Sequence, residues 1–109
     1  MADADPGLDE ALAELWLRAR VRVDARIDVL EEAAAALAAG SLTPEERDRA
    51  RTQAHQLAGL LGTLGLPAAS PVARRVEHLL ADDPGREDAP AVAEGARELR
   101  RAAAEGPTG

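Results

Sequence analysis

His55 is the residue of this sequence best suited to chemistry, and three glycines follow it closely. The stretch AHQLAGLLGTLG, residues 54–65, has a helical pattern yet contains Gly59, Gly62 and Gly65. A glycine inside a helix costs about 1 kcal/mol relative to alanine, so these residues need a reason. An imidazole is partly neutral and nucleophilic near neutral pH. We interpret Gly59 and Gly62 as clearance that lets a reactive group of another macromolecule approach the ring.

The direction in which His55 points follows from the apolar pattern around it. A helix advances about 100° per residue. The apolar residues that then share one side are Ala50, Ala54, Leu57, Leu61 and Leu64. His55 falls roughly opposite this core stripe, so we expect the imidazole to face solvent. On geometry alone, an ordinary surface histidine in an alanine- and glycine-rich chain stays an open alternative.

Composition limits both the fold and the partners. The 109 residues fit one domain, 1–109, and we expect frayed tails at 1–7 and 105–109. The absence of cysteine excludes thiol catalysis, disulfides and cysteine-bound zinc. The net charge of -7 and the single aromatic residue argue against nucleic acid or an anionic membrane as a partner. We expect a cytoplasmic protein, because the acidic N-terminus lacks the features of a signal peptide, and a monomer, because the charge of -7 and the small alanine-rich surface disfavour self-association.

The elements that must position His55 are helices. Alanine, leucine, arginine and glutamate dominate, and apolar residues recur at helical spacing, which predicts an all-α fold. Short loops between amphipathic helices favour an antiparallel up-down four-helix bundle. The four predicted helices run over about 8–40, 44–64, 70–80 and 88–103.

Local signals mark where these helices begin and break. Thr43 is a predicted N-cap that forms a capping box with Glu46. Ser70 is a predicted cap of the third helix, and Asp88 a predicted cap of the fourth. The arginine-rich stretch Arg18–Arg22 predicts a bend that would separate a short leading helix from a longer one.

The other residues whose side chains could take part in catalysis or metal binding are interpreted as structural. His78 is expected at the flank of the third helix. It lies 23 positions from His55 with no ligand-rich motif around either residue, so no metal site is expected. Acidic pairs such as Glu45–Glu46 are interpreted as capping and solubility groups. Trp16 is expected in the core or as a lid over one end of the bundle.

The stretch after His55 resembles the histidine-containing phosphotransfer (HPt) domain of bacterial multistep phosphorelays. That family's signature is His, any residue, an aliphatic, Lys, Gly, two small residues, and Gly ten places after the His, with a Leu-Glu-like pair on the next helix. The resemblance covers essentially the whole chain. The positions that match are His55, Leu57, Gly59, Gly65 and the pair Val76–Glu77.

Two departures from this signature concern charge and volume. Ala58 stands where the family has lysine, and Leu60 and Leu61 stand where it has two small residues. The missing lysine removes a positive charge that would help to hold a phosphoryl group. Arg51, one turn before His55, is a candidate replacement. On this hypothesis Arg51→Ala slows phosphotransfer from a receiver domain, and an unchanged rate would dispose of it.

The resemblance implies a phosphocarrier that is not a kinase and binds no nucleotide. His55 would take the phosphoryl group from the aspartyl phosphate of a response-regulator receiver domain and pass it to another receiver. Receiver domains and hybrid histidine kinases are the implied partners. The receiver would supply Mg²⁺, so no cofactor is expected in this chain. The implied docking surface consists of Arg51, Thr52, Gln56, Ala58, Gly59 and Gly62.

Two other functions stay open. The first is an adaptor of the same fold that binds receiver or kinase domains without carrying phosphate, and it is favoured by Ala58 in place of lysine. Such an adaptor would gain no acid-labile phosphate from a phosphorylated receiver. The second is a helical module with an unrelated partner, which predicts that Gly59→Arg leaves binding intact.

Overall fold

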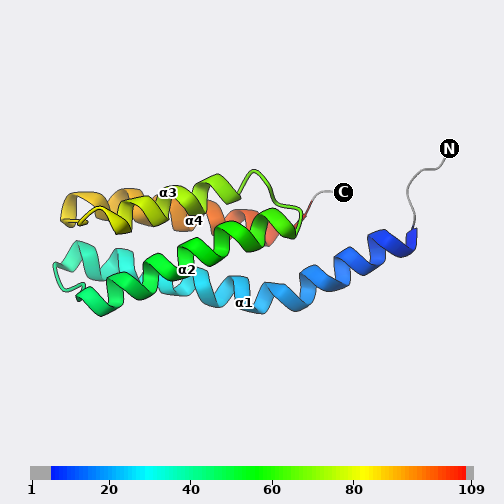
Figure 1. The fold of residues 1–109 in the computed structure, drawn as a ribbon, viewed down its shortest axis with the longest axis horizontal. Coiled ribbons are helices and arrows are strands. Elements are labelled where there is room, and N and C mark those ends of the chain that lie inside the picture. The colour runs from blue at the N-terminus through cyan, green and yellow to red at the C-terminus, as the bar shows by residue number, and fades with distance from the viewer. Residues whose placement is uncertain (1–5, 108–109) are drawn as a thin grey trace.

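Four α-helices make up most of residues 6–107, the part of the chain that the computed structural model describes (Figure 1). Each helix packs against its neighbours in sequence, and the last helix closes the bundle against the first. No strand occurs in this range, and the predicted all-α, antiparallel four-helix bundle is confirmed. The elements are α1 (Pro6–Ala39), α2 (Pro44–Thr63), α3 (Ser70–Ala81), the 3₁₀ turn η1 (Arg86–Asp88) and α4 (Ala89–Glu105).

The first helix is continuous. It has 34 residues, so the separate leading helix predicted before Arg18–Arg22 is wrong, although Figure 1 shows that the axis of α1 changes direction along its length. The buried stripe continues through this stretch, because Ala19 and Val23 are both in the core. Arginine is a good helix former, and Arg20 pairs with Asp24 one turn later at 3.6 Å. Nothing in the stretch therefore interrupts the helix.

The N-terminal part of α1, residues 6–15, extends beyond the other three helices, and we call it the α1 overhang (Figure 1). Leu12 lies one turn before the buried Trp16 and continues the core stripe, yet it is 51% exposed. Leu15 is 43% exposed. These leucines have the spacing of core residues, but no helix lies over them.

The opposite chain end packs against the bundle. The helices include Pro6, Gly7 and Glu105, which are three residues of the ranges 1–7 and 105–109 that were expected to be frayed. Residues 1–5 and 108–109 lie outside the described residues. A Cβ atom added at Gly106 would lie 3.1 Å from the indole nitrogen of Trp16, which is buried. Trp16 therefore belongs to the core and covers this end of the bundle, as expected.

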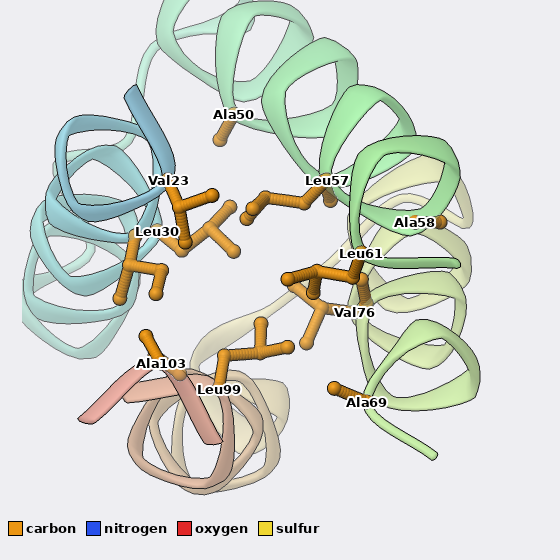
Figure 2. Close-up of a cluster of buried hydrophobic side chains, with 14 of the residues drawn as sticks. Val23, Leu30, Ala50, Leu57, Ala58, Leu61, Ala69, Val76, Leu99 and Ala103 are labelled. Carbon is orange, nitrogen blue, oxygen red and sulfur yellow. The ribbon is translucent and has the colours of Figure 1, made fainter. Parts of the chain in front are cut away.

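The core is built from aliphatic side chains and alanines (Figure 2). The whole predicted stripe of α2 is buried, at Ala50, Ala54, Leu57, Leu61 and Leu64. Leu57 and Leu61 point into the centre of the bundle, and Ala58, also buried, lies on the side of α2 nearer α3. Burial of this stripe fixes the rotation of α2 about its own axis.

Both ends of α2 are capped. The capping box is confirmed, since the Thr43 hydroxyl accepts from the Glu46 amide at 3.1 Å and the Glu46 carboxylate accepts from the Thr43 amide at 2.9 Å. At the other end Gly65 adopts a φ of 90°, a left-handed conformation that favours glycine. The Leu66 amide then donates to the Leu61 carbonyl at 2.9 Å and closes the helix.

One predicted cap is wrong, and the other is in place but forms no capping hydrogen bond through its side chain. Ser70 is the first residue of α3 rather than its cap, and its buried hydroxyl donates to the Ala58 carbonyl of α2 at 2.7 Å. The hydroxyl therefore joins α3 to α2 and caps no amide of its own helix. Asp88 occupies the cap position of α4, but its carboxylate accepts from the Gly85 amide at 2.9 Å and closes η1 instead.

Three carboxylates of α1 meet one arginine of α4. The guanidinium of Arg100 lies 2.6 Å from Asp28, 2.8 Å from Glu31 and 3.4 Å from Asp24. The hydrogen bond to Glu31 is the main cause that raises the pKa of Arg100 above its ordinary value, and the bond to Asp28 adds to it against partial desolvation. The cluster ties the last helix to the first.

Helices α3 and α4 approach closely at Gly95. The residue is buried, and a Cβ atom added there would overlap Cγ2 of Val76, which is fully buried in α3. Gly59 contrasts with it, because a Cβ atom at Gly59 would meet no atom within 4 Å. Gly95 therefore allows α3 and α4 to pack closely, whereas Gly59 leaves the surface of α2 without a side chain.

We expect Gly95→Ala to lower the free energy of unfolding by about 1–3 kcal/mol, because the new methyl group must displace Val76. Gly59→Ala is the matched control and should raise the free energy of unfolding by about 0.5–1 kcal/mol through helix propensity. Urea denaturation followed by circular dichroism measures both. In a Val76→Ala background the loss from Gly95→Ala should shrink. Equal stability of Gly95→Ala and the unaltered chain would contradict the close contact.

Candidate functional site

His55 stands on the outer face of α2. Its side chain is 73% exposed, which confirms the prediction that the imidazole faces solvent. Nδ1 lies 3.1 Å from a carboxylate oxygen of Glu77 on α3. The Glu77 side chain is only 21% exposed, so the carboxylate is held between the helices and the ring extends beyond it.

The hairpin formed by α2 and α3 explains why these two residues meet. His55 lies eleven residues before Leu66 in the connecting loop, and Glu77 lies eleven residues after it. In an antiparallel helix pair, residues equally distant from the loop lie at about the same height. The Ser70 hydroxyl bond to the Ala58 carbonyl fixes this register close to the site. Glu77 was part of the family resemblance, but its contact with His55 was not predicted.

The two glycines beyond His55 differ in how open they are. Both are exposed. A Cβ atom at Gly59 would meet nothing within 4 Å, whereas one at Gly62 would come 3.9 Å from the Ser70 hydroxyl. The surface one turn beyond His55 is therefore bare at Gly59, and it becomes more enclosed at Gly62, where the loop leads into α3.

The remaining residues of the predicted docking surface lie on two sides of His55. Arg51, Thr52 and Gln56 are exposed, and with His55 and Glu77 they line a shallow hollow of about 260 Å³. We call it the Arg51 hollow. The Gln56 amide oxygen also accepts a hydrogen bond from Arg26 of α1, which donates to Gln53 as well. Gln56 is thus tied toward α1.

A second hollow, of about 350 Å³, lies on the other side of His55. We call it the Gly59 hollow. Ala58 contributes little surface to it because it is 4% exposed, so the predicted docking residue Ala58 is available to a partner only at its edge. The hollow is lined by His55, Ala58 and Gly59 of α2 and by Arg74, Glu77 and His78 of α3.

Sequence reasoning assigned no role to Arg74. The signal that could have found it is the same count from the loop, because Ala58 and Arg74 are each eight residues from Leu66. Arg74 also lies three residues before Glu77, so both side chains share one face of α3. The exposed position expected for His78 is confirmed.

The described residues show neither a metal centre nor a membrane span. Between residues 6 and 107, no group of three or more His, Cys, Asp or Glu side chains is placed to hold a metal ion. Within the same range, every helix is too short or too polar to cross a bilayer.

Comparison with known proteins agrees with this geometry. No curated protein and no solved structure matches the chain. The family model described as the Hpt domain matches residues 10–105, which include all of α2, α3 and α4 and most of α1. The chain, with His55 exposed on the second helix of its bundle, therefore belongs to the Hpt domain family.

Proposed function

We propose that this chain is a phosphocarrier of a His-Asp phosphorelay. His55 accepts a phosphoryl group from the aspartyl phosphate of a receiver domain and passes it to another receiver. The observation that carries the proposal is the exposed imidazole, bonded to Glu77 through one nitrogen and bordered by the bare surface of Gly59. Family membership supports the same role, because Hpt domains carry phosphoryl groups.

The contact with Glu77 determines which ring nitrogen reacts. An ionised carboxylate can only accept a hydrogen bond, so the Nδ1 atom that faces Glu77 carries the proton. In the neutral ring the lone pair then lies on Nε2. Nε2 is the nucleophile of the proposed transfer, and Glu77 is a positioning residue that holds the ring and its tautomer.

The transfer itself needs little apparatus in this chain. The Nε2 lone pair forms a bond to phosphorus while the bond from phosphorus to the aspartyl oxygen breaks, and the leaving electron pair stays on the receiver's carboxylate. The ring becomes a positively charged phosphoimidazole, and its Nδ1 proton remains shared with Glu77. Phosphoryl transfer depends mainly on in-line positioning and charge neutralisation. A partner that brings Mg²⁺ supplies part of that neutralisation.

Phosphoryl acceptance on His55 is tested directly by mass spectrometry. Candidate receiver domains are phosphorylated with acetyl phosphate and mixed with the chain. We expect the unaltered chain and His78→Gln to gain one acid-labile phosphoryl group and His55→Gln to gain none. His78→Gln is the matched control, because His78 lines the Gly59 hollow together with His55. A chain that binds phosphorylated receivers but gains no phosphate is an adaptor, and a phosphorylated His55→Gln refutes the assignment of His55.

Docking over the bare surface is tested by filling it. Gly59→Arg should abolish transfer from a phosphorylated receiver, because the long side chain occupies the space beside His55. The fold should persist, since no atom lies within 4 Å of the added Cβ. Gly59→Ala serves as control and should retain transfer. Isothermal titration calorimetry with the same receiver measures docking, and binding by Gly59→Arg as tight as that of the unaltered chain would show that the receiver does not dock over Gly59.

The role of Glu77 is tested by the imidazole tautomer. In the unaltered chain, ¹⁵N NMR of the neutral imidazole should show His55 protonated on Nδ1. Glu77→Ala should give a mixture of tautomers, because no acceptor remains beside Nδ1. Glu77→Gln should keep the tautomer, since its amide oxygen can accept the same bond. If Glu77→Ala leaves the tautomer unchanged, the carboxylate does not position the ring.

A further inference from the structure

A phosphoryl group on His55 would place negative charge beside a carboxylate. Glu77 lines both hollows that flank the imidazole. A phosphate oxygen in either hollow is therefore repelled by Glu77 unless a cation lies close by. Phosphate is bound best by guanidinium groups, which donate several hydrogen bonds from a planar, permanently charged fork. One arginine borders each hollow, Arg51 on α2 and Arg74 on α3.

Arg74 is free to take up such a role. Among the residues that the structure describes, it forms no ion pair or hydrogen bond through its side chain, whereas the next residue, Arg75, pairs with Glu98 of α4 at 3.3 Å. Two arginines adjacent in sequence thus differ in their contacts. Arg75 joins α3 to α4, and Arg74 lies in the Gly59 hollow, beside the exposed imidazole.

The two hollows differ in the room they leave for a phosphoryl group. The Arg51 hollow is narrowed by the side chains of Thr52 and Gln56, and Gln56 is held there by Arg26. In the Gly59 hollow the only residues of α2 beside His55 are Ala58 and Gly59. Helix α2 therefore places no large or charged side chain there. A phosphate there would meet a cation only from α3.

We propose that Arg74 binds the phosphoryl group carried by His55, in the Gly59 hollow. This inference rests on the proposed phosphocarrier function and names a residue of that same site. The guanidinium donates hydrogen bonds to the phosphoryl oxygens and offsets the charge of Glu77. The fold holds Arg74 at this height through the α2–α3 register, which the Ser70 bond to Ala58 sets one turn away.

The test uses a phosphoryl donor too small to dock as a protein does. Phosphoramidate phosphorylates a neutral imidazole directly, with formation of an N–P bond and release of ammonia. The full-length chain is treated with phosphoramidate, and phosphohistidine is followed by ³¹P NMR and intact mass. We compare Arg74→Ala, Arg74→Lys, Arg51→Ala and Arg75→Ala with the unaltered chain. Arg75→Ala is the matched control, because it removes an identical charge from the adjacent position of the same helix.

We expect Arg74→Ala to phosphorylate about three- to ten-fold more slowly, the range for one charge-assisted contact at a partly exposed site. Arg74→Lys should recover part of the rate, and Arg75→Ala should match the unaltered chain. A similar loss of rate in Arg75→Ala would mean that the rate depends only on net charge, and it would overturn the specific role of Arg74. A loss confined to Arg51→Ala, or no loss in any variant, would overturn it as well.

The outcomes separate this inference from the proposed function. If the unaltered chain gains phosphate on His55 from both phosphoramidate and a phosphorylated receiver while Arg74→Ala reacts equally fast, only the role of Arg74 is refuted. If the unaltered chain gains phosphate on His55 from neither donor, the phosphocarrier function fails and the role of Arg74 fails with it. Thermal unfolding by circular dichroism shows in parallel that every variant compared is folded.

Discussion

The rotation of α2 about its own axis is the constraint on which the site depends. Full burial of one leucine contributes about 1.5–3 kcal/mol, and α2 and its C-cap bury Leu57, Leu61 and Leu64 together with several alanines. A single exposed pair such as His55 with Glu77 contributes at most about 1 kcal/mol. The core therefore decides which way α2 faces, and the exposed position of His55 is a consequence of leucine burial on the opposite side.

The second helix cannot form the site alone. It supplies the imidazole and the bare surface, but the carboxylate and the guanidinium of the Gly59 hollow both come from α3. The position of α3 depends on the Ser70 hydroxyl, on the left-handed turn at Gly65 and on the close contact of Gly95 with Val76. The arrangement around one reactive ring is thus determined by residues of the loop and of the far interface.

Periodicity predicted the parts of the molecule that depend on a single helix. The buried stripe of α2, the outward direction of His55 and the Thr43 capping box each follow from spacing within one segment. Prediction failed where a side chain has hydrogen-bond partners available on two helices. Ser70 was predicted to cap its own helix, but its hydroxyl donates to the Ala58 carbonyl of α2. The contact of Glu77 with His55 needed the register between helices, which spacing inside one helix does not contain.

The α1 overhang gives the molecule a gradient of local stability along its longest helix. No other helix lies over the backbone of residues 6–15, whereas the backbone near Ile27 lies against a closed core. Opening of helices begins where tertiary contacts are fewest. Amide protons of the overhang should consequently exchange with solvent long before those of α2, so that the chain unravels from one tip while the segment bearing the reactive imidazole stays intact.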